Sequence, residues 1–72
     1  MKTEEAMNEV GKLMEGEFWI YPEGDYGRAE IWLIHNLYFL FSISTFGGTP
    51  SFEAVFSKYN IEQMIKVVEK WT

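Results

Sequence analysis

The sequence contains no cysteine and only one histidine among its 72 residues. Without cysteine, a disulfide framework and a thiolate zinc site are both excluded. With His35 as the single imidazole, any histidine-dependent nucleophile or metal site has to be built around that one residue. The most apolar stretch, residues 31–43, is interrupted by His35 and Asn36 and is shorter than the roughly 20 residues that a membrane-spanning helix needs. We therefore expect no membrane span, no metal and no cofactor.

Basic residues are also scarce. Six lysines and arginines stand against eleven acidic residues, which gives a net charge of −5. Residues 1–30 hold eight of the acids and three of the bases. This acidic N-terminal segment repels a phosphate backbone. Its negative charge therefore disfavours nucleic acid and favours a basic protein as the partner. The acidic start of the chain lacks the features of a secretory or transit peptide, and the expected location is the cytoplasm.

Aromatic residues are abundant, with three tryptophans, four tyrosines and six phenylalanines. A chain of this length leaves roughly 40% of its surface exposed on folding, so it gains stability only from an unusually rich core or from a partner. The sequence has no internal repeat and no linker long enough to separate domains. Residues 1–72 are expected to form a single domain.

The hydrophobic pattern predicts a helix at residues 3–15, four strands, and a final helix that runs towards Trp71. Thr3 is the expected cap of the first helix, and Gly16 is its expected stop. The strands are predicted at residues 17–21, 28–34, 37–44 and 51–56. His35 and Asn36 are the expected tight connection between the second and third strands, with one long bent strand as the alternative. Asn60 and Gln63 resemble a capping box before the last helix. The fold class is therefore α+β, a four-stranded antiparallel meander sheet flanked by an N-terminal and a C-terminal amphipathic helix.

The strand period divides the sheet residues between two faces. The face expected under the helices carries Phe18, Ile20, Ile31, Leu33, Leu37, Phe39, Phe41, Ile43, Phe52, Ala54 and Phe56. The other face is expected to carry Trp19, Tyr21, Trp32, Ile34, Tyr38, Leu40 and Val55 among polar residues. Aromatic side chains grouped on an open sheet exceed the apolar patch of a typical monomer. One helix on each face, a homodimer through this second face, and a different partner are the three arrangements considered.

Residues suited to catalysis are few. Glu23, Asp25 and Glu30 do not reproduce a calcium-binding loop, and Gly47-Gly48 lacks the lysine of a phosphate-binding loop. The glycines are better suited to a hairpin turn, and His35 to a turn residue. A domain this small offers no evident deep cleft in which carboxylate pKa values are shifted. The chain is therefore not expected to be an enzyme.

The C-terminal half has a strand-turn-strand-helix texture. It runs from Tyr38-Phe39-Leu40-Phe41 through Gly47-Gly48-Thr49-Pro50 to the helix containing Ile61-Glu62-Gln63-Met64-Ile65. In this texture it resembles short uncharacterised proteins of phages and mobile elements of Gram-positive bacteria. The resemblance covers about half of the chain and implies no functional residue. It implies a context in which small acidic proteins bind host nucleases or regulators.

Together these features predict a small, acidic, non-catalytic protein-interaction module. In the context that the resemblance implies, it inhibits or modulates a host nucleic-acid-binding enzyme, as an anti-CRISPR or DNA-mimic protein does. The expected partner-binding residues are Glu4, Glu5, Glu9, Trp19, Tyr21, Trp32 and Tyr38. The alternative is a single-stranded nucleic-acid-binding protein that stacks bases on the aromatic face.

Overall fold

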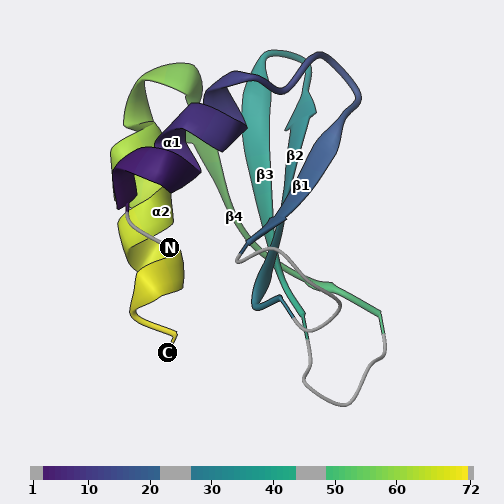
Figure 1. Cartoon of the computed structure of the whole chain (residues 1–72). Coiled ribbons are helices and arrows are strands. Elements are labelled where there is room, and N and C mark those ends of the chain that lie inside the picture. Colours follow the sequence, from purple (N-terminus) through teal and green to yellow (C-terminus); the bar gives the residue numbers. More distant parts are fainter. Residues whose placement is uncertain (1–2, 22–26, 44–48, 72) are drawn as a thin grey trace.

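The computed structural model describes residues 3–21, 27–43 and 49–71. The elements follow one another as α1 (Thr3–Gly11), β1 (Phe18–Tyr21), β2 (Ala29–Ile34), β3 (Leu37–Ser42), β4 (Ser51–Ser57), the 3₁₀ helix η1 (Lys58–Asn60) and α2 (Ile61–Glu69). The strands form one antiparallel sheet in the order β1-β2-β3-β4 (Figure 1). The predicted α+β meander with a helix at either end is confirmed. Glu23, Asp25 and the predicted Gly47-Gly48 turn lie outside the described residues.

The hairpin between β2 and β3 is built on His35 and Asn36. Both residues have positive φ angles, 51° and 66°. This is the backbone of a type I′ turn, whose twist matches that of the flanking strands. Ile34 therefore pairs with Leu37 across the turn. The predicted tight connection is confirmed, and the alternative of one bent strand is wrong.

Helix α1 is shorter than predicted. It ends at Gly11, and the backbone N–H groups of Lys12 and Leu13 bond three residues back, to Glu9 and Val10. Glycine weakens a helix by about 1 kcal/mol relative to alanine, and these tighter bonds close the last turn. The chain then turns through Gly16, which has a φ of 86°, into β1. The prediction that the helix continues to residue 15 is wrong.

Helix α2 begins differently from the prediction as well. Asn60 makes no side-chain capping bond, so the expected capping box with Gln63 is wrong. The hydroxyl of Ser57 instead accepts the backbone N–H of Tyr59 at 3.3 Å and starts η1, which continues directly into α2. At the far end, Thr3 Oγ1 donates to Glu69 Oε1 at 2.5 Å. The start of α1 is thereby tied to the end of α2. No helix of the described chain is long and apolar enough to cross a membrane.

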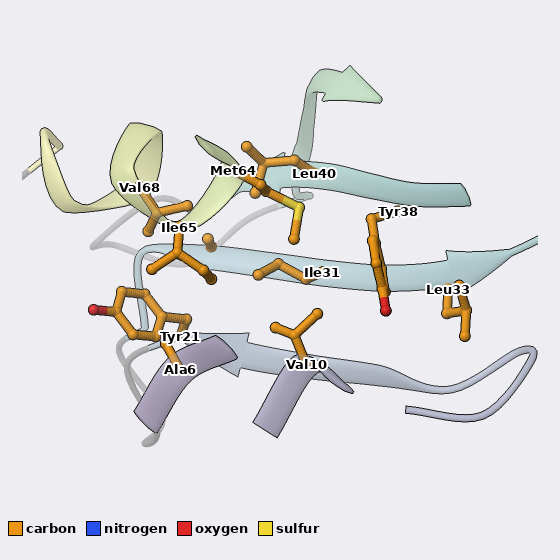
Figure 2. Close-up of a cluster of buried hydrophobic side chains, with 11 residues drawn as sticks. Ala6, Val10, Tyr21, Ile31, Leu33, Tyr38, Leu40, Met64, Ile65 and Val68 are labelled. Carbon is orange, nitrogen blue, oxygen red and sulfur yellow. The ribbon is translucent and has the colours of Figure 1, made fainter. Parts of the chain in front are cut away.

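Both helices pack on the same face of the sheet (Figure 1). Between the helices and the strands lies a cluster of buried side chains, shown in Figure 2. The cluster consists of Ala6, Val10, Tyr21, Ala29, Ile31, Leu33, Tyr38, Leu40, Met64, Ile65 and Val68. The arrangement with one helix on each face is therefore wrong, and none of the described elements packs on the other side of the sheet.

The predicted division of side chains between the two faces is right for β2 and wrong for β1 and β3. In β4 it is right for Ala54 and Phe56 but wrong for Phe52, because a register shift pairs Phe52 with Phe41. The two-residue turn pairs Leu33 with Tyr38 and Ile34 with Leu37, so Tyr38 shares the side of Leu33. Opposite residues on paired strands point to the same face. Tyr38 and Leu40 therefore lie under the helices, and Leu37, Phe39 and Phe41 lie on the other side. The prediction shifted β3 by one residue relative to β2. A one-residue shift moves every side chain of a strand to the opposite face of the sheet.

Candidate interaction surface

The side of the sheet away from the helices, here called the open face, is made of three rows of side chains. The strand register aligns each row across the sheet. The central row is Phe18, Trp32, Phe39 and Val55. On one side of it lies the row Ile20, Glu30, Phe41 and Phe52, and on the other the row Ile34, Leu37 and Ser57. The central row is apolar on all four strands.

Ring contacts order the aromatic side chains of the open face. Phe18 stacks on Trp32 with ring centroids 4.7 Å apart and 24° between the planes. The rings of Phe41 and Phe52 pack edge to face with centroids 5.8 Å apart, and the centroids of Phe39 and Phe52 lie 6.4 Å apart. These are the favourable geometries of aromatic pairs. The rings nevertheless remain accessible, with 47% of Phe18 and 58% of Phe52 exposed.

Glu30 is the one charged side chain in the three rows. Its carboxylate accepts the indole N–H of Trp32, which satisfies the polar atom of that ring without a partner molecule. Glu30, Trp32, Ile34 and Phe41 also line an open groove of about 350 Å³, with Thr49 and Pro50 on its rim. The open face therefore offers apolar contact and one carboxylate, and no cation within its rows.

Among the aromatic residues predicted to bind a partner, Trp32 alone lies on the open face. Tyr21 and Tyr38 are buried beneath the helices. Trp19 packs against the same core, and its Nε1 is buried without a hydrogen bond to any described residue. The expectation that Trp19, Tyr21 and Tyr38 form an exposed face with Trp32 is wrong. They were misplaced because their strands were assigned the opposite phase.

Burial changes the acidity of the two core tyrosines. It raises the pKa of Tyr38 above the ordinary 10.0. Burial also raises the pKa of Tyr21, and the nearby carboxylate of Glu69 raises it further, whereas Arg28 lowers it. Both phenols therefore lose their protons at a higher pH than an ordinary tyrosine does.

The predicted acidic residues lie on α1, in the helix layer and away from the open face. Glu4 and Glu5 are exposed, and Glu9 pairs with Lys12 at 3.4 Å. Exposed pairs of this kind contribute about 0–1 kcal/mol. The structure thus separates the acidic and the aromatic candidate residues onto two different sides of the molecule.

The described residues contain no group of three histidine or carboxylate side chains placed to hold a metal ion. His35 lies exposed in the β2–β3 turn. Its backbone N–H donates to Glu15, which also accepts the N–H of Asn36 at 3.3 Å. In these contacts Glu15 supports the turn.

The phenylalanines of the open face were predicted to lie in the core, beneath the helices, and this prediction is wrong. The residues concerned are Phe18, Phe39, Phe41 and Phe52. A signal was present in β2, because Glu30 marks the even positions of that strand as the solvent side. Combined with a two-residue turn at residues 35–36, it places Leu37, Phe39 and Phe41 on that same side.

Comparison with protein-family models, curated proteins and solved structures finds no match to this chain.

Proposed function

We propose that this chain is a non-catalytic protein-interaction module that binds its partner with the open face. The observation that carries the proposal is the placement of both helices on one side of the sheet. It leaves a row of four apolar residues exposed or half-exposed across all four strands on the other side. An apolar patch of this extent on a soluble domain is typical of a protein-binding site.

The charge of the open face supports a protein over a nucleic acid as the ligand. Single-strand binders combine stacking rings with a positively charged groove. In the rows of the open face the rings are accompanied by the carboxylate of Glu30. A phosphate backbone next to that carboxylate is repelled, so base stacking on this surface is less favoured than apolar contact with a protein.

Inhibition of a host nucleic-acid-binding enzyme remains a separate proposal for the acidic helix α1. Its contacts would involve Glu4, Glu5 and Glu9 rather than the open face. Reversing these three charges tests that proposal without altering the aromatic rows. Unchanged capture of a basic partner by the charge-reversed chain would rule it out.

The open-face proposal is tested with three forms of the chain used as bait: the native chain, Phe52→Glu and Met14→Glu. Met14 is 70% exposed and lies outside the three rows, so its variant is the matched control for adding a carboxylate to an exposed apolar site. We expect the native and Met14→Glu baits to retain one and the same partner protein, and the Phe52→Glu bait to lose it. An untagged copy of the chain itself counts as such a partner. Equal retention by all three baits, with circular dichroism showing each to be folded, would contradict the proposal.

A further inference from the structure

We propose that the open face binds a second copy of this chain, so that two sheets pack face to face in a symmetric dimer with the helices on the outside. The inference rests on the proposed function above and names the partner of the same surface. Four observations support it: the shape of the face, its area, the position of its one charge and the distribution of the remaining charge.

The shape of the open face suits another sheet. Its central row crosses all four strands, from Phe18 on β1 to Val55 on β4. Two sheets pack face to face about 10 Å apart when such rows interdigitate. A second copy presents a face of the same width and composition, and a twofold axis brings the two together with each surface as its own complement.

The area of the open face is sufficient for a dimer. The most accessible residues are Phe18 and Val55, both 47% exposed, Phe52, 58% exposed, and Leu37, 38% exposed. Because a large aromatic side chain carries about 150–250 Å², these four residues and the half-buried members of the rows present about 500–600 Å². Two copies then bury about 1,000–1,200 Å² in total, which reaches the lower end of stable protein interfaces.

The one charge on the open face lies at its edge. Glu30 belongs to the row at one end of the strands, next to Phe41, and not to the central row. Its carboxylate already accepts the indole N–H of Trp32. A charged group at the rim of an interface keeps part of its contact with water, so Glu30 weakens the association without preventing the central rows from meeting.

The remaining charge does not oppose association through this face. In a face-to-face dimer, the two α1 helices carrying Glu4 and Glu5 lie on opposite outer sides. One sheet-to-sheet spacing and two helix-to-sheet spacings of about 10 Å each place them about 30 Å apart. This exceeds the Debye length of about 8 Å at physiological ionic strength, so repulsion between the two acidic helices is screened. Dimers built through the helix layer would instead bring these carboxylates together.

Sedimentation equilibrium tests the dimer directly. We expect the native chain and Met14→Glu to have twice the 8.5 kDa mass of one chain, and Phe52→Glu to raise the dissociation constant by at least about 30-fold. A folded native monomer at high micromolar concentration would overturn the dimer. In that case the bait experiment still tests the proposed function. If the open face binds a different protein, the native bait retains that protein and the Phe52→Glu bait loses it.

Cysteine cross-linking tests the orientation, since the chain has no cysteine of its own. Phe39→Cys places a thiol in the central row on the inner strand β3, near the middle of the open face, and Glu5→Cys places one on α1 as the matched control. With a short bismaleimide we expect a covalent dimer from Phe39→Cys and none from Glu5→Cys. The reverse result, or a dimer that persists unchanged in Phe52→Glu, would overturn the face-to-face arrangement.

Discussion

The indole N–H of Trp32 donates a hydrogen bond to the carboxylate of Glu30, two residues earlier on β2. Phe18 stacks on the same indole from β1. The ring is therefore held on the sheet by a polar contact along its own strand and an apolar contact across to the next. The Glu30 carboxylate therefore has a structural role, because it orients the ring. It also carries a desolvation cost, because binding at this surface removes water from the charge.

Replacing Glu30 with glutamine is expected to tighten the dimer. The amide retains an acceptor for the Trp32 indole, and its transfer from water costs less than that of a carboxylate. We expect the dissociation constant measured by sedimentation equilibrium to fall by about threefold or more, which corresponds to roughly 0.6 kcal/mol or more. Glu5→Gln on α1, the matched control, should leave it unchanged. Weaker association of Glu30→Gln would show that the charge itself supports the interface.

Two leucines of β3 provide a matched test of the two faces. Leu40 is buried in the core, whereas Leu37 is 38% exposed on the open face. In a Phe52→Glu background, at a concentration where sedimentation equilibrium gives the mass of one chain, Leu40→Ala is expected to lower the free energy of unfolding by about 2–5 kcal/mol and Leu37→Ala by less than about 1 kcal/mol. Urea denaturation measures both. Equal losses would mean that the open face is covered within the monomer.

The contact between Glu15 and the β2–β3 turn is expected to stabilise the hairpin. The carboxylate accepts the backbone N–H groups of both His35 and Asn36. Glu15→Ala is expected to lower the free energy of unfolding by about 1 kcal/mol, since water replaces these exposed bonds only in part. Amide hydrogen exchange at His35 and Asn36 should accelerate. Glu62→Ala, which removes an exposed ion pair with Lys66 of 2.9 Å, is the control and should cost less than about 0.5 kcal/mol. Unchanged exchange at the turn would contradict the proposed role of Glu15.

Stability is expected to fall in alkaline solution because of the buried tyrosines. Burial raises the pKa of Tyr38 above 10.0, so the unfolded chain loses this proton at a lower pH than the native chain does. The contribution of the neutral phenol to the free energy of unfolding is fully present below pH 10.0, and it is lost as the pH rises from there through the native pKa.

Urea midpoints recorded between about pH 8 and pH 11 measure this effect, because the range spans the ordinary pKa of tyrosine. Tyr38→Phe should flatten the alkaline decline. Tyr59→Phe changes a tyrosine that is 96% exposed and should leave the decline unchanged. The same slope in the native chain and in Tyr38→Phe would show that Tyr38 does not carry the effect.

The sequence by itself determined the elements and their order, because these depend on local periodicity and turn chemistry. The run of aromatic and β-branched residues that begins at Leu37 and the helical stripe of Met64, Ile65 and Val68 are both local patterns. The same reasoning failed at helix ends, where single hydrogen bonds decide. Gly11 ended α1 early, and Ser57 rather than Asn60 formed the cap before α2.

Only the tertiary structure decided which face of the sheet the helices cover. Most residues of β1 and β3 are apolar on both faces of the strand. Their sequence therefore does not show which face points to the core and which to solvent. The strand register across the His35–Asn36 turn and the packing of both helices on one face together placed Tyr38 in the core and Phe39 on the open side. Since the second face stays apolar without a helix to cover it, the tertiary arrangement also defines the candidate interaction surface.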